Sequence, residues 1–148
     1  MTEVRPIVLA SGEGEALDLR GAQMRIKVGA LTAGAGFSLI ESQDPTGFAA
    51  APHIHHEAAE AFYVLEGEYV LQCGEEETVI LPGGFAFVPS GVSHGYRLVS
   101  AQGRILILFA PAGIERFWQE LGRQLAAGTL TPEIRSKLAR DMIATEFL

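Results

Sequence analysis

Short apolar segments separated by Gly, Pro and Ser residues run through most of this 148-residue chain. Near the start, Met24, Ile26 and Val28 alternate with polar or charged residues. Because side chains alternate between the two faces of a strand, this pattern predicts a half-buried β-strand. Many short strands at regular intervals predict an all-β fold, a sandwich or a barrel, over about residues 20–110. The other predicted strands lie within residues 36–42, 60–67, 68–74, 77–84, 85–91, 93–100 and 103–111.

After Pro111 the spacing of the apolar residues changes to that of a helix. Gly128 is a typical helix terminator, and Thr131 followed by Pro132 is a typical helix start. We therefore predict a helical segment over about residues 112–147, with its apolar side packed on the barrel. The apolar stripe of the first helix, with residues three or four positions apart, consists of Ile114, Phe117, Trp118, Leu121 and Leu125.

The charge and composition exclude several classes of protein. With a formal net charge of -7 at pH 7, the chain lacks the basic surface that binds nucleic acids and anionic membranes. No stretch reaches the roughly 18 consecutive apolar residues of a membrane helix, and the first residues do not resemble a signal peptide. We therefore expect one cytoplasmic domain, residues 1–148, that binds a small molecule rather than a nucleic acid or a membrane.

Three of the four histidines lie within four consecutive residues. In a strand, His53 and His55 point to one face, and His56 points to the other. Two imidazoles about 7 Å apart along one strand face can bind the same ion. Glu60 begins the next predicted strand. The four residues between His55 and Glu60 are enough for a turn, so the Glu60 carboxylate can reach the ion that the two imidazoles bind. His94, shortly after a Pro-Ser-Gly turn, is the fourth candidate.

The type of ion follows from these side chains. Three imidazoles and one carboxylate suit one divalent transition metal ion, namely Fe, Ni, Mn, Co, Cu or Zn. They suit Ca or Mg poorly, because those ions prefer oxygen ligands. The competing interpretation is an exposed polar strand face without a metal, since a histidine in a β-protein is usually at the surface or in a hydrogen bond.

Two sets of residues have the spacing of the two sequence motifs of the cupin superfamily. The first set, with five, one, four and six residues between its members, consists of Gly47, His53, His55, Glu60 and Gly67. The second set, with five, one and two residues between its members, consists of Gly83, Pro89, Gly91 and His94. The second motif usually ends in Asn, and Leu98 takes that position here, so a substrate contact through that Asn is not expected.

This resemblance implies a cupin β-barrel, a jelly roll also described as a double-stranded β-helix. It also implies a metal ion bound by His53, His55, Glu60 and His94. Over most of its length the chain is similar to the small single-domain bacterial cupins described as quercetin 2,3-dioxygenase-like, which are commonly homodimers. The implied function is a metal-dependent dioxygenase that acts on a small aromatic or enolisable molecule. Two alternatives are a non-redox isomerase, cyclase or lyase, and a small-ligand-binding protein without turnover.

Strand parity also predicts which side chains point into the barrel. They either line an apolar substrate pocket or fill the core, because small barrels fill much of their interior. Tyr96 is a candidate catalytic residue through its hydroxyl. Glu60 is another, because the resemblance to quercetinases implies that its carboxylate takes the hydroxyl proton of the substrate. The predicted pocket-lining residues are Met24, Ile26, Phe62, Val64, Tyr96 and Leu98.

Overall fold

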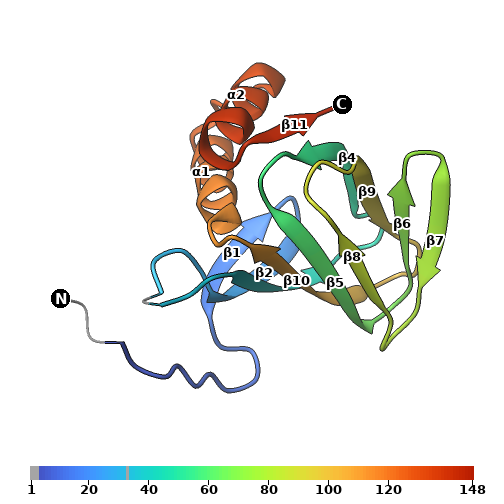
Figure 1. Ribbon diagram of the computed structural model, residues 1–148, viewed down its shortest axis with the longest axis horizontal. Helices are drawn as coiled ribbons and strands as arrows, with labels where there is room; N and C mark the ends of the chain where they lie inside the picture. Colours follow the sequence, from blue (N-terminus) through green and yellow to red (C-terminus); the bar gives the residue numbers. More distant parts are fainter. Residues whose placement is uncertain (1–3, 33) are drawn as a thin grey trace.

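The computed structural model describes residues 4–32 and 34–148, which form two antiparallel β-sheets and two helices (Figure 1). One sheet consists of β1 (Glu15–Leu19), β2 (Ala22–Val28), β3 (Ser38–Asp44), β10 (Gly103–Ala110), β5 (Ala59–Glu66) and β8 (Phe85–Val88), in that order. The other consists of β11 (Thr145–Phe147), β4 (Ala49–His55), β9 (His94–Leu98), β6 (Tyr69–Cys73) and β7 (Glu76–Ile80). From β3 to β10 the chain crosses repeatedly between the sheets, as in a jelly roll. The predicted all-β fold is confirmed, with two open sheets instead of one closed barrel.

The hydrophobic core lies between the two sheets and follows from the alternation within each strand. In β10, Ile105, Ile107 and Phe109 are buried, whereas the residues between them are only partly buried. Strand β10 pairs with β3 on one side and β5 on the other. Phe62 and Val64 of β5 are almost completely buried beside it. Burying an apolar side chain of this size contributes about 1.5–3 kcal/mol, and this burial holds the sheets together.

Two helices follow the strands, as the sequence predicts. Helix α1 (Ile114–Ala127) ends at Gly128, whose φ of 70° lies in the left-handed region that glycine adopts without strain. Helix α2 (Pro132–Ile143) begins after Thr131, whose hydroxyl accepts a hydrogen bond from the N–H of Ile134 (3.1 Å). Figure 1 shows α1 near β1, and α2 beside β11. Within the described residues, no helix is long and apolar enough to span a membrane.

The C-terminal residues differ from the predicted helical segment. Ala144 has a φ of 44°, in the left-handed region, and ends α2. The chain then forms β11, which pairs with β4 so that Thr145 lies opposite His55. The edge of β4 offers unpaired backbone N–H and C=O groups, and pairing with it satisfies them better than a further helical turn would. The helix therefore ends at Ile143, and the residues after it complete the five-stranded sheet.

A buried carboxylate attaches α1 to the six-stranded sheet. Glu115 accepts hydrogen bonds from the backbone N–H of Ala30 (2.6 Å) and from the hydroxyl of Ser38 (2.6 Å). Ser38 in turn accepts a hydrogen bond from the N–H of Gly113, just before the helix (2.8 Å). The carboxylate fits here because Gly29 has no side chain; a Cβ at that position would lie 2.5 Å from Glu115 Oε1. These contacts fix the helix that forms one wall of the cavity described below.

Replacing Glu115 with alanine is expected to lower the free energy of unfolding by about 2–4 kcal/mol. The change removes two hydrogen bonds to the carboxylate and leaves the buried hydroxyl of Ser38 without its acceptor. Denaturant unfolding followed by circular dichroism measures the effect. Arg116→Ala, at an exposed position of the same helix, is the matched control and should change stability by less than about 0.5 kcal/mol. Equal stability of the two variants would contradict the anchoring role of the carboxylate.

Candidate metal centre and its cavity

Four titratable side chains from three strands meet between the two sheets. His53 and His55 lie on the same face of β4, and the pairing of β4 with β9 places His94 opposite His53. Glu60 comes from β5, which belongs to the other sheet. All four are buried, whereas His56 points away and is exposed beside Glu146. The structure therefore brings together the four residues that the sequence selects and leaves out the neighbouring histidine.

The potential ligand atoms of the four side chains lie within 4.8 Å of one another. Nε2 of His55 is 3.1 Å from Nε2 of His53 and 3.1 Å from Oε2 of Glu60. The same carboxylate oxygen is 2.6 Å from Nε2 of His94 and 3.9 Å from Nε2 of His53. Atoms this close can share one ion at ordinary metal–ligand distances of about 2.0–2.2 Å.

The outer nitrogen of each imidazole has a hydrogen-bond partner of its own. The Nδ1–H of His53 donates to the carbonyl of Ala51 (2.8 Å), and that of His94 donates to the carbonyl of Val92 (3.0 Å). A carbonyl oxygen can only accept, so Nδ1 carries the proton in both rings. In their neutral forms, both rings therefore direct the lone pair of Nε2 toward the centre of the cluster.

The third imidazole is oriented by a residue from the C-terminal strand. The hydroxyl of Thr145 donates to the carbonyl of Ile143 (3.0 Å), which leaves its oxygen free to accept from Nδ1–H of His55 (2.6 Å). In its neutral form, each of the three histidines thus presents an Nε2 lone pair toward Glu60. Four electron-pair donors facing one another need a positive charge between them. This donor set, with its outer hydrogen bonds, fits a divalent transition metal ion.

The electrostatics of the cluster agree with a cation-binding role. Burial raises the pKa of Glu60, but the three imidazoles beside its carboxylate outweigh this effect and hold that pKa well below its usual range. Burial lowers the pKa of His55, which favours its neutral, metal-binding form. Burial also lowers the pKa of His94, but its hydrogen bond with Glu60 raises it more. A metal ion that binds Nε2 of His94 would displace a proton from that atom at any pH where the ring is protonated.

Thr145→Val is expected to weaken metal binding about 10- to 100-fold, because it removes the acceptor that orients the His55 ring while keeping the side-chain volume. Competition with a metal chelator of known affinity measures the change. Thr145→Ser retains the hydroxyl and should bind the metal nearly as tightly as the unaltered protein. A valine variant with unchanged affinity would show that the hydrogen bond to His55 does not contribute.

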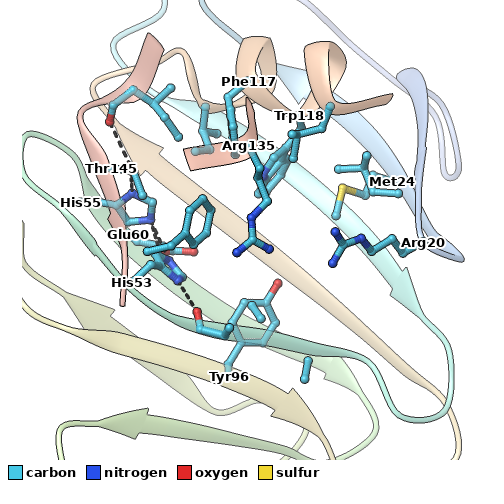
Figure 2. A pocket seen from close by; sticks show the side chains of 18 of the residues that line it. Arg20, Met24, His53, His55, Glu60, Tyr96, Phe117, Trp118, Arg135 and Thr145 are labelled. Carbon is cyan, nitrogen blue, oxygen red and sulfur yellow. Dashed lines mark hydrogen bonds and ion pairs between the residues drawn. The ribbon is translucent and has the colours of Figure 1, made fainter. Parts of the chain in front are cut away.

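A cavity of about 210 Å³ opens beside the cluster. His53, His55 and Glu60 contribute to one side of it, and Figure 2 shows them facing the same space as Tyr96 and Trp118. Its other walls are mainly apolar and are formed by α1, α2, β11 and strands of both sheets. Such a cavity can hold an apolar organic molecule against the cluster. The aromatic residues that line it are Phe48, Tyr96, Phe109, Phe117, Trp118 and Phe147.

The six predicted pocket residues occupy two different environments. Met24 and Tyr96 line the cavity. The other four are buried in the core and do not line it. Phe62, for example, packs its ring 5.0 Å from the ring of Tyr96 and fills space behind it. The alternation of residues along a strand shows on which face of the sheet a side chain lies. It does not show how deeply the side chain is buried, so it does not distinguish cavity-lining residues from core residues. The four core residues are Ile26, Phe62, Val64 and Leu98.

The hydroxyl of Tyr96 is available to a bound molecule. Figure 2 shows it directed into the cavity, and it makes no hydrogen bond to any residue that the structure describes. Burial, followed by the negative charges of Asp44 and Glu60, holds the pKa of Tyr96 well above its usual value. The hydroxyl therefore keeps its proton at neutral pH and can donate a hydrogen bond to a ligand.

Three polar or charged side chains of the site are not found by the sequence analysis. Thr145 orients His55, and Arg20 and Arg135 line the cavity. Thr145 belongs to a three-residue strand, too short for a periodic pattern to be recognised. The two arginines lie in a turn and on a helix, where the sequence pattern suggests ordinary exposed charges.

Comparison with known proteins identifies the family. A cupin domain matches residues 39–110. The quercetin 2,3-dioxygenase of Bacillus subtilis (strain 168) is 35% identical over 118 residues, which are 79% of this chain but 35% of that protein. The chain thus spans about a third of that relative's length. An uncharacterized protein of Streptomyces coelicolor is 30% identical over 69% of this chain and 85% of its own length.

The solved structures include KdgF from Halomonas sp., with a TM-score of 0.64 and 19% identity. The match covers 72% of this chain and 96% of KdgF, and at this level of identity it supports the fold. The region that matches the cupin domain runs from β3 to β10 and contains His53, His55, Glu60 and His94. The chain therefore belongs to the cupin superfamily.

Proposed function

We propose that the protein is a metal-dependent dioxygenase that acts on a small aromatic or enolisable molecule. The observation that carries this proposal is a buried cluster of three histidines and one glutamate that faces a mainly apolar cavity lined in part by aromatic side chains. The 35% identity to a quercetin 2,3-dioxygenase over 79% of the chain supports this class of reaction. Together they favour oxygen chemistry on a ring or enol over other reactions on the cupin fold.

The metal ion would be held by His53, His55, Glu60 and His94. When bound, it would supply Lewis acidity toward a substrate oxygen and a path for electrons between substrate and O2. The ion is one of Fe, Ni, Mn, Co, Cu or Zn, because these accept imidazole and carboxylate ligands together.

The side chains around this centre bind the substrate and hold its proton. Oε2 of Glu60 faces the histidines, whereas Oε1 makes no hydrogen bond to a described residue and can accept the substrate's hydroxyl proton. Tyr96 donates a hydrogen bond to a second substrate oxygen. The rings of Phe117 and Trp118 exclude water and orient a flat molecule against the cluster.

Oxygen consumption by the metal-loaded protein tests the proposal. The protein is reconstituted with each candidate metal, and an oxygen electrode is used with quercetin and with simpler enols. We expect oxygen uptake that depends on both the metal and the substrate. Turnover of the same substrates without oxygen would overturn the dioxygenase proposal and support a non-redox isomerase, cyclase or lyase. Saturable binding without any product would support a ligand-binding protein instead.

We also propose that the protein forms the homodimer that the family resemblance implies. Tyr63, Phe85 and Phe87 are exposed on β5 and the edge strand β8. Tyr63 lies directly opposite Phe85, so these rings form one apolar surface that a second copy of the chain could cover.

A further inference from the structure

Two arginine side chains reach into the cavity beside the candidate metal centre. Arg20 comes from the turn between β1 and β2, and Arg135 comes from α2. Figure 2 shows both guanidinium groups in the same part of the cavity, with the hydroxyl of Tyr96 directed toward them. Both arginines lie outside residues 39–110, the region that matches the cupin domain. They are therefore not part of the shared cupin motifs.

Arg135 has an unused hydrogen-bond donor inside the protein. Its guanidinium carbon lies 4.1 Å from the centre of the Phe147 ring, a cation–π contact that uses the face of the group. The N–H groups in the guanidinium plane stay available, and the Nε–H is buried without a partner in the described part of the chain. A buried N–H without an acceptor is unfavourable and rare in native proteins. The missing acceptor points to a ligand.

Arg20 occupies a backbone position that does not suit arginine. It forms a two-residue hairpin turn with Gly21, and its φ of 53° lies in the left-handed region. Turns of this type favour Asn, Asp or Gly at both central positions, because other side chains are strained there. Strained positions of this kind cluster at binding and catalytic sites. The side chain that this turn directs to the cavity is exposed at its rim.

The two positive charges have no acidic partner within the described residues. Neither Arg20 nor Arg135 forms an ion pair there, although the chain carries 18 acidic residues. Among the residues that line the cavity, Glu60 is the sole acid, and its Oε2 is engaged by the histidines. Burial, and then the charge of Arg20, lowers the pKa of Arg135. A bound anion would relieve both effects.

We propose that the substrate carries a carboxylate group, which Arg135 and Arg20 bind while its ring or enol lies in the aromatic cavity. This proposal rests on the proposed function, because it assigns the substrate class of the same site. A guanidinium binds the two oxygens of a carboxylate through parallel hydrogen bonds. Apart from the cluster and Thr145, the lining side chains offer N–H or O–H donors only from Arg20, Tyr96, Trp118 and Arg135. One planar guanidinium fork in a cavity with mainly apolar walls suits a single carboxylate on an apolar molecule.

The position of Phe147 links this anion site to the metal centre. Its ring contacts the guanidinium of Arg135, and its centre lies 6.0 Å from the centre of the His53 ring. A small molecule lying along Phe147 can therefore place a carboxylate at Arg135 and a hydroxyl or enol oxygen at the cluster. The same two contacts fix the direction in which the substrate enters the site.

Binding of a matched pair of probes to the purified protein tests this inference without any need for turnover. Isothermal titration calorimetry compares 2-naphthoate with 2-naphthamide, which has the same rings and no charge. We expect naphthoate to bind at least about 10-fold more tightly, the effect of charge-assisted hydrogen bonds. In Arg135→Met, which keeps the apolar part of the side chain and removes the charge, the preference should fall below about 3-fold. Arg140→Met, an exposed position on the same helix, is the control and should keep the full preference.

Two further variants keep the test valid if Arg135→Met folds poorly. Arg135→Lys retains the charge and should keep part of the preference, and Arg20→Met should reduce it without affecting the core. The inference would be overturned by equal affinity for the two probes or by no measurable binding of naphthoate. It would also be overturned if Arg135→Met lost affinity for both probes equally. A preference for naphthoate in a protein that consumes no oxygen would overturn the dioxygenase proposal alone. Oxygen uptake without the preference would overturn the carboxylate site alone.

Discussion

His94→Ala is expected to lose the bound transition metal, with an affinity at least about 100-fold lower than that of the unaltered protein. The change removes one of three nitrogen ligands and leaves Glu60 without its shortest contact, the 2.6 Å approach to Nε2 of His94. Elemental analysis by inductively coupled plasma mass spectrometry, on the purified and the reconstituted protein, measures the metal content. We expect close to one ion per chain in the unaltered protein and little in the variant.

The exposed histidine of the same sequence cluster provides the control for this experiment. His56→Ala should keep the full metal content, because the His56 side chain points away from the cluster toward Glu146. Thermal unfolding of both variants checks that the fold is intact, since His94 is 1% exposed and its loss leaves a small cavity. A folded His94→Ala variant with stoichiometric metal would refute the assignment of His94 as a ligand.

Glu60→Gln is expected to retain part of the metal and to lower the rate of oxygen uptake per bound ion about 10²- to 10⁴-fold. The amide keeps the shape of the side chain and one oxygen near the histidines, but it cannot take the hydroxyl proton of the substrate. The measurement combines metal content with initial rates at saturating substrate. The change should appear in kcat more than in KM, because the proton moves during the reaction.

Glu57→Gln is the matched control for the glutamate. Glu57 lies three residues earlier, in the exposed turn between β4 and β5, and the same chemical change there should leave both metal content and rate unaltered. If Glu60→Gln reacted at the normal rate per bound ion, Glu60 would be a metal ligand without a role in proton transfer.

Much of the fold and of the candidate metal centre could be predicted from local patterns. The alternation in Met24, Ile26 and Val28 indicated a strand, and Thr131 with Pro132 marked the start of a helix. These predictions succeed because backbone conformation depends strongly on neighbouring residues and on the period of burial. The spacing of His53 and His55 likewise determines that they share one face of a strand, whatever the rest of the chain does.

Other features were decided by contacts between residues far apart in the sequence. Pairing of β11 with β4 brings Thr145 to His55, and no pattern near either residue specifies that pairing. The depth of each side chain depends on how the sheets pack, which is why Leu98 lies in the core and Tyr96 lines the cavity.

By itself, the sequence determined most of the strands and both helices, because these depend on local spacing, and its two motifs, through their resemblance to the cupin superfamily, indicated the family and the four residues of the cluster. Only the tertiary structure decided which side chains enclose the cavity and that Arg20 and Arg135 both reach it. The physical reason is that a cavity is bounded by segments whose positions are fixed by the packing of the whole core and not by their own residues.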